Sequence, residues 1–291
     1  MLAPFLQYLI SGITVGMVYA FSALGFSLIY NASGVVNFAQ GEFIMLGGML
    51  AVFFSKAGLP FPAAAVLAIV IPTLLGMMIE RLTIARAKNA EILSLIIITI
   101  GISLVLRGLT QIFMGKAVHA LAPISDSRPI HLAGAVMHSQ SPWVLGFTVT
   151  VMAMLWYFFR HSLSGKKILA TSCNRSAAQL MGINTQWVMT FSYAMAAALG
   201  SLAGVLITPI TMTSYDVGIM LGLKGFIGAV VGGMGSGMGA IAGGLIVGIA
   251  ESLGAGYISS AYKDAMAFLL IFVILFLRPR GLFGAKATDR V

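Results

Sequence analysis

Residues 31–48 read NASGVVNFAQGEFIMLGG, and this stretch decides how the chain is built. No charged side chain occurs from Met1 to Gly41, and Glu42 is the first one. The next charge, Lys56, comes after thirteen residues, whose rise as a helix is about 20 Å. Because a bilayer core is about 30 Å thick, Glu42 and Lys56 cannot lie in opposite headgroup layers. Either Glu42 lies inside the membrane, or a half-helix begins partway through it.

The residues before Glu42 supply a break in the helix. Gly34, Asn37 and Gly41 interrupt the apolar run, and Asn37-x-x-Gln40 predicts a capping box that opens a new helix at Phe38. Transporters use broken helices whose N-termini point at the midplane to present polar groups to a substrate. The alternative is an interfacial loop with Glu42 in the first turn of a short helix, where the helix dipole favours a carboxylate.

The composition indicates an all-α polytopic membrane protein. Hydrophobic residues make up 59% of the 291 and charged residues 9%, with a mean hydropathy of +1.00. A soluble domain carries about 25% charged residues. The apolar runs are continuous, whereas a membrane β-barrel alternates over segments of about ten residues. The single Cys173 excludes an internal disulfide and a cysteine-cluster metal site.

The apolar runs predict about eight transmembrane helices, together with glycine-broken or re-entrant half-helices. No cleavable signal peptide is expected, because the first run lacks a basic N-terminal region and is long enough to span. Arg107 is expected to snorkel outward from its helix in a structural role. The predicted spans are 4–30, 38–54, 59–78, 92–114, 142–159, 187–208, 225–234, a return segment ending near 258, and 262–277.

Basic residues set the predicted orientation. The linker 80–91, the loop 160–184 and the tail from Arg278 hold eleven of the seventeen Lys and Arg residues, which places all three in the cytoplasm. The net charge of +9 therefore reflects basic loops, with no nucleic-acid partner expected. Lys224 then lies outside, and the N-terminus is periplasmic while the C-terminus is cytoplasmic.

This orientation requires the chain to reverse direction within residues 232–237. The two halves of the chain then each contain one glycine-broken segment, as in a possible inverted repeat, and such a pair is a sequence pointer to a transporter's binding site. The candidate residues of the substrate pathway are Asn37, Gln40, Gly41, Glu42, Gly233, Gly235 and Ser236.

Catalytic and nucleotide-binding motifs are missing from the sequence. Gly165-Lys166-Lys167 lacks the upstream glycine and the Ser or Thr of a Walker A loop, so this chain is not expected to hydrolyse ATP alone. The glycines around Ser236 do not form a nucleophile elbow. The four histidines lie in predicted loops without metal-ligand spacing, and no cofactor is expected.

Residues 176–182, SAAQLMG, lie in the basic loop 160–184. Small residues followed by glycine suit a short amphipathic helix that packs into a groove on a partner, and the alternative is a solvated helix. The segment resembles the E-A-A-x-x-x-G coupling motif of ABC importer permeases. Ser176 stands where that motif commonly has Glu, so a charge contact with the ATPase is either missing or supplied by Arg175.

The whole chain resembles the branched-chain amino acid ABC permease family, in particular the shorter of its two permease types. Several blocks in the same order carry this resemblance over nearly the full length, and each block alone is weak evidence. The blocks are 34–43, 99–103, 176–183, 222–226, 232–236 and 278–284.

The resemblance implies that residues 1–291 form a single transmembrane permease domain of an ATP-driven importer for Leu, Ile and Val in the bacterial inner membrane. The implied partners are a second permease subunit, two cytoplasmic ATP-binding subunits, an extracytoplasmic substrate-binding protein and membrane lipid. The outer loops 115–141 and 211–224 would receive the binding protein. The implied coupling residues, which transmit closure of the ATPases, are Arg175, Ser176, Ala177, Ala178 and Gly182.

The sequence is compatible with other transported solutes and with other classes of protein. Related permeases move urea, short amides or other amino acids. A stand-alone secondary carrier or channel is a second class, although only Glu42, Arg107 and Glu251 qualify as intramembrane ionisable groups, fewer than such carriers usually show. A membrane-embedded enzyme is a third class, which the missing catalytic residues disfavour.

Overall fold

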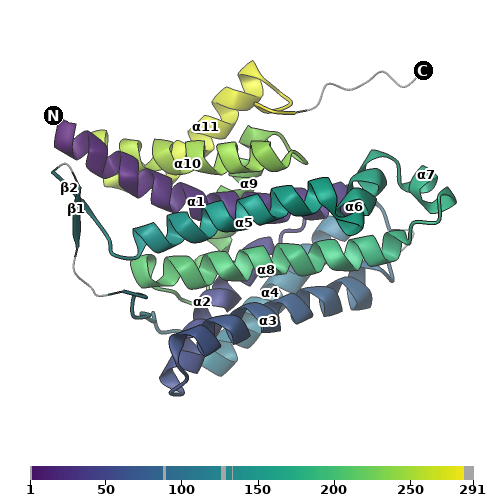
Figure 1. Ribbon diagram of the computed structural model, residues 1–291, viewed down its shortest axis with the longest axis horizontal. Helices are drawn as coiled ribbons and strands as arrows, with labels where there is room; N and C mark the ends of the chain where they lie inside the picture. Colours follow the sequence, from purple (N-terminus) through teal and green to yellow (C-terminus); the bar gives the residue numbers. More distant parts are fainter. Residues whose placement is uncertain (1, 88–89, 126–128, 133, 285–291) are drawn as a thin grey trace.

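The computed structural model describes residues 2–87, 90–125, 129–132 and 134–284 (Figure 1). Helices dominate these residues, and one antiparallel hairpin joins β1 (Ile130–Leu132) to β2 (Ala135–Met137). The helices are α1 (Leu2–Ser33), α2 (Gln40–Lys56), α3 (Phe61–Ile79), the π-helix η1 (Glu80–Ile84), α4 (Ile92–Met114), α5 (Ser141–His161), α6 (Leu163–Cys173), α7 (Arg175–Leu180), α8 (Thr185–Thr211), α9 (Val217–Gly232), α10 (Gly237–Tyr257), the 3-10 helix η2 (Ser260–Tyr262) and α11 (Lys263–Leu277).

Seven helical segments in the described residues are long and apolar enough to cross a membrane. They correspond to α1, α3 with its π-helical extension, α4, α5, α8, α10 and α11 with η2. Helices α2 and α9 are shorter, at 17 and 16 residues. The predicted all-α, multi-pass membrane class is confirmed. Helix α2 begins within the first predicted break, and α9 ends where the second one begins.

The centre of the bundle is made by α1 and α8, which are the most buried spans, while α5 and α11 lie at the periphery. Glycines allow the helix backbones to meet directly. A Cβ added at Gly12 would lie 2.8 Å from the Cα of Ile249 on α10, and Gly47 of α2 faces the backbone of Ser201 on α8 in the same way. Small residues at helix contacts are the usual means of close packing in a membrane, where there is no hydrophobic drive between helices.

The two ends of the bundle carry different features (Figure 1). The N-terminus and the hairpin lie at one end, where Gln7 Nε2 donates a hydrogen bond to the carbonyl of Val136 at 2.6 Å. Helices α6 and α7 lie at the opposite end. The chain reverses between α9 and α10 through Gly233 and Gly235, both with positive φ. This reversal confirms the one that the distribution of basic residues required.

Helices α1–α4 and α8–α11 pack in matching ways. Helix α2 lies against α8 and α3, and α9 lies correspondingly against α1 and α10. Helices α1 and α8 run in opposite directions between the two ends (Figure 1). This exchange of partners with reversed direction is the arrangement that an inverted repeat produces.

Within this arrangement, the counterpart of the break after α1 is the turn after α8. Gly34 and Met212 both have positive φ at these two places. The glycine turn between α9 and α10 instead corresponds to the turn between α2 and α3, so the two predicted breaks are not equivalent positions.

Two predicted boundaries are wrong. Helix α2 begins at Gln40 rather than Phe38, and no capping box forms, because Asn37 Oδ1 accepts from the Ala39 N–H at 3.1 Å while Gln40 points toward α8. The predicted linker from Glu80 begins as π-helix, in which the buried Glu80 accepts hydrogen bonds from Gln186 at 2.7 Å and Thr190 at 2.6 Å.

The prediction of an outer loop over residues 211–224 is also wrong, because most of this range is helical. Helix α9 begins at Val217, and Lys224 is buried in the middle of it. A buried ammonium is tolerated here because Lys224 Nζ lies 2.9 Å from Glu251 Oε1 and 2.6 Å from Asp264 Oδ1. The apolar run therefore continues through a charge that the sequence alone places at the surface.

Candidate functional site

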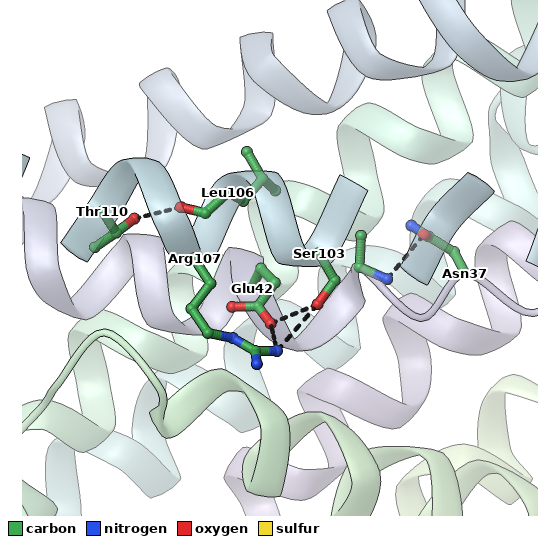
Figure 2. A network of polar contacts seen from close by, with 7 residues as sticks. Asn37, Glu42, Ser103, Leu106, Arg107 and Thr110 are labelled. Atoms are coloured by element: carbon green, nitrogen blue, oxygen red, sulfur yellow. Dashed lines mark hydrogen bonds and ion pairs between the residues drawn. The ribbon is translucent and has the colours of Figure 1, made fainter. Parts of the chain in front are cut away.

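Glu42 is the centre of a polar cluster between α2 and α4 (Figure 2). Its side chain is 2% exposed, and its Oε1 accepts from Ser103 Oγ at 2.7 Å and from Arg107 Nη2 at 2.9 Å. Ser103 and Arg107 are four residues apart, so both point from one face of α4 toward α2. Arg107 Nη2 also lies 3.3 Å from Ser103 Oγ, which closes the cluster.

The cluster lies at mid-depth along α4. Ser103 is the central residue of this 23-residue helix, which rises about 34 Å. That length is close to the thickness of a bilayer core. A carboxylate bonded to Ser103 therefore lies near the midplane of a membrane that α4 spans, and this position favours the membrane-embedded alternative for Glu42 over the interfacial loop.

The sequence predicted that Arg107 snorkels outward from its helix, and this prediction is wrong. The guanidinium turns toward Glu42, and its side chain remains 22% exposed. A charge is costly at this depth unless it is paired, and the Glu42 carboxylate offers a partner at hydrogen-bond distance. The sequence gives no distance between these two residues, which are 65 positions apart.

A cavity of about 160 Å³ adjoins the ion pair. Glu42, Ser103 and Arg107 form its polar side. Its apolar walls come from α1, α4 and α9 and from the segment between α1 and α2, and they include Phe26, Phe38, Ile100, Leu223 and Phe226. The site thus combines one cation and one anion with a mainly aromatic and aliphatic surface.

A larger cavity of about 870 Å³ opens toward the end of the bundle that carries α7. Ser176 and Gln179 of α7, Gln186 of α8 and Thr99 of α4 are among its lining residues. Thr99 Oγ1 accepts a hydrogen bond from the Phe38 N–H at 3.2 Å. Because Thr99 lines the large cavity and Phe38 lines the small one, this contact lies between the two cavities.

The four predicted residues of the first break have different surroundings. Glu42 is the one of the four that lines the small cavity. Asn37 is buried beside the backbone of Ala39, and Gln40 donates to the Ala196 carbonyl on α8 at 2.9 Å. Gly41 lies against the backbone of α9. Gln40 and Gly41 therefore help to hold α2 in place.

The second break lies elsewhere in the bundle. Gly233 packs against Gly281 and Gly284 of the C-terminal segment, the Gly235 carbonyl accepts from Asn31 Nδ2 at 2.8 Å, and Ser236 Oγ caps α10. Gly222, which contacts Gly41, and Gly233 are eleven positions apart along α9 and its C-cap, a rise of about 16 Å. The structure does not bring the two breaks together, and a pathway role for the second one stays a prediction.

The predicted coupling segment forms α7. Asn174 Oδ1 caps this helix by accepting from the Ala177 N–H at 3.1 Å, and Gly182 has a φ of +80° just after its end. Ala178 is buried, whereas Arg175, Ser176 and Ala177 are exposed. At the C-terminal end of α7, Leu180 and Met181 are 90% and 83% exposed, so this end of the molecule presents an apolar tip.

Sequence reasoning missed two buried polar groups. One is Glu80 with its partners on α8, and the other is the pair of Lys224 and Glu251, which the half-exposed Asp264 and Lys263 join at its edge. A signal for the second was available, because Lys224 and Glu251 each interrupt a long apolar run. Charges inside such runs indicate either a loop or a buried pair, and here they form a pair.

Comparisons with known proteins give one consistent result. A sequence model of the family described as "Branched-chain amino acid transport system / permease component" matches residues 8–275. The high-affinity branched-chain amino acid transport system permease protein LivH of Escherichia coli is 33% identical and aligns with 99% of this chain and 98% of its own length. BraD of Pseudomonas aeruginosa, a permease protein described in the same words, is 31% identical over the same shares of both chains.

More distant similarities extend beyond these relatives. The ribose import permease protein RbsC of Haemophilus influenzae is 28% identical over 88% of this chain and 80% of its own. The structure of PsaBC from Streptococcus pneumoniae in complex with Fab is similar with a TM-score of 0.53, at 16% identity over 96% of this chain and 97% of that one. At this identity the second similarity concerns the fold alone.

Proposed function

This chain belongs to the family of branched-chain amino acid transport system permease components, and we propose that it is the transmembrane permease subunit of an ATP-driven importer for Leu, Ile and Val. The observation that carries the proposal is the match to LivH over nearly the full length of both chains. The sequence contains no Walker A loop, so ATP hydrolysis belongs to separate subunits.

The proposed complex places this chain in the bacterial inner membrane beside a second permease subunit. Two ATP-binding subunits dock on the cytoplasmic side, and a substrate-binding protein delivers the solute from outside. The end of the bundle with α6 and α7 faces the cytoplasm, because the loop 160–184 holds four basic residues. The N-terminus and the hairpin then face outward, and the loop 115–141 receives the binding protein.

Helix α7 is the proposed contact with the ATPases. Its exposed tip, Leu180 and Met181, offers apolar surface to a groove on a partner. Ala178 packs back toward the bundle, and Gln179 Nε2 donates to Thr185 Oγ1 at the start of α8 at 2.8 Å. Movement of α7 is thereby passed to α8, which lies along both α1 and α2.

The proposed pathway runs past Glu42. The small cavity beside the ion pair holds the solute at mid-membrane, and the large cavity, which Thr99 lines, releases it toward the cytoplasm. Access alternates when ATP binding biases two states of the bundle, as for other transporters with a central site.

Reconstitution tests the proposal directly. The chain is purified with the second permease subunit and both ATPases, placed in liposomes, and supplied with the substrate-binding protein and labelled leucine. We expect uptake that requires ATP and the binding protein. Uptake of leucine by the isolated chain without ATP would instead identify a secondary carrier, and ATP-dependent uptake of urea or short amides but not leucine would reassign the substrate.

A further inference from the structure

The ion pair of Glu42 and Arg107 leaves two buried polar atoms unused. Glu42 Oε2 and Arg107 Nε have no hydrogen-bond partner among the residues that the structure describes. A carboxylate has about four lone-pair sites and a guanidinium five N–H donors. Buried polar groups without partners are rare and costly, so the pair has capacity for a further charged ligand.

We propose that the cavity beside this pair binds a zwitterionic amino acid, which enters between the two side chains. The carboxylate of the ligand pairs with Arg107, and its ammonium pairs with Glu42. The apolar side chain lies against the walls formed by Phe26, Ile100 and Phe226. This inference rests on the proposed function and specifies how the transported solute is recognised at mid-membrane.

Charge balance is the first argument for this assignment. Removing one partner of a buried ion pair leaves an uncompensated charge, which is strongly destabilising. A zwitterion replaces each lost partner with an opposite charge, so Glu42 and Arg107 exchange partners without either becoming unpaired. A guanidinium also binds carboxylates through two parallel hydrogen bonds, and the Nε atom of Arg107 is available for one of them.

The size of the cavity is the second argument. Its volume of about 160 Å³ is close to that of an engineered apolar cavity of about 150 Å³ that binds benzene. A branched side chain of three or four carbons fits such a space. A sugar offers hydroxyl groups without charge, and these cannot replace either member of the pair.

The contact between α2 and α9 offers a way for the site to open. Glu42 Oε2 faces α9, where a Cβ added at Gly218 would lie 2.8 Å from it. Gly41 of α2 meets Gly218 and Gly222 through backbone atoms alone. Because only backbone atoms meet at this contact, a shift of α9 away from α2 would not have to disengage interlocked side chains there, and it would expose the second carboxylate oxygen to the ammonium of a ligand.

The test uses the complete importer in lipid nanodiscs without the binding protein, and a diazirine analogue of leucine as the probe. After illumination, mass spectrometry locates the labelled residues. We expect labels on the cavity walls at Phe26, Phe38, Ile100, Leu223 or Phe226. Leucine should compete at least tenfold better than 4-methylpentanoate, which lacks the ammonium, and than 3-methylbutylamine, which lacks the carboxylate. Ribose should not compete.

Three variants complete the test. Glu42→Gln and the double variant Glu42→Gln/Arg107→Met should both lose labelling at least tenfold, and the double variant stays folded because it leaves no lone charge. The control Glu251→Gln alters the other buried ion pair and should keep the labels. Labels outside the cavity, equal competition by leucine and its two singly charged analogues, or full labelling of the double variant would overturn the inference.

The two proposals fail differently. ATP-driven leucine uptake by the wild-type importer, together with any of the three overturning results, refutes the zwitterion site and leaves the proposed function intact. Labelled cavity walls without ATP-driven leucine uptake would refute the proposed function and leave the zwitterion site intact.

Discussion

Lys224 Nζ lies 2.9 Å from Glu251 Oε1 and joins the middle of α9 to α10. The same ammonium lies 2.6 Å from Asp264 Oδ1 on α11. In the other half of the chain, Glu42 joins α2 to α4 through Arg107. Each short helix is therefore tied by an ion pair to the last helix of its own half, with the signs of the charges exchanged. These ion pairs hold α2 and α9, which at 17 and 16 residues are too short to span the membrane alone.

The first prediction concerns the stability contributed by Lys224. Replacement by Met should lower the free energy of unfolding in detergent by about 3 kcal/mol, because it leaves Glu251 buried without its closest cation. Lys263 Nζ, at 3.2 Å from Glu251 Oε1, compensates in part and keeps the loss near the lower end of the usual range. Thermal unfolding followed by circular dichroism measures the change.

The matched control is the double variant Lys224→Met/Glu251→Gln. It removes both buried charges and should recover most of the lost stability, since the charges that lose a partner, Asp264 and Lys263, are each half exposed. Equal losses in the single and double variants would show that packing, rather than the ion pair, explains the effect.

The spans were predictable because they depend on local composition. The bounds of α4 agree with the sequence prediction at both ends, and the reversal near Gly235 followed from the placement of basic residues. The ion pairs were not predictable, because they depend on which helix faces meet. The sequence predicts that Arg107 snorkels outward from its helix and that Lys224 lies in a loop, since neither partner is near in the sequence.

A second prediction concerns the close contact between α2 and α9. Gly41→Ala should destabilise the protein by about 1–3 kcal/mol, because the added methyl group meets the Gly218 carbonyl oxygen and the backbone of Gly222. Gly108→Ala on α4 is the matched control, since a Cβ there has no neighbour within 4 Å in the described structure. The control should be neutral or stabilised by up to about 1 kcal/mol, as expected for alanine in a helix. Equal melting temperatures for the two variants would contradict the contact.

A third prediction concerns the orientation of the chain. Cys173 at the end of α6 is exposed and should react with a membrane-impermeant maleimide only after intact spheroplasts are permeabilised. In a Cys173→Ser background, Val136→Cys on β2 should react in intact spheroplasts, because Val136 is exposed at the opposite end of the bundle. Labelling of Cys173 in intact spheroplasts would reverse the proposed orientation.

The last prediction concerns coupling through α7. Ala178 is buried on the face of α7 that packs toward the bundle, so Ala178→Phe has no room and must shift the helix. We expect at least a tenfold loss of ATP-driven leucine uptake in proteoliposomes, while the rest of the bundle keeps its melting temperature. Ser172→Phe on α6 is the control, because Ser172 is exposed and lies outside α7. Normal uptake by Ala178→Phe would mean that the position of α7 does not matter to the importer. A loss of uptake with the ATPases still bound would instead locate the defect in the step from α7 to α8, where Gln179 contacts Thr185.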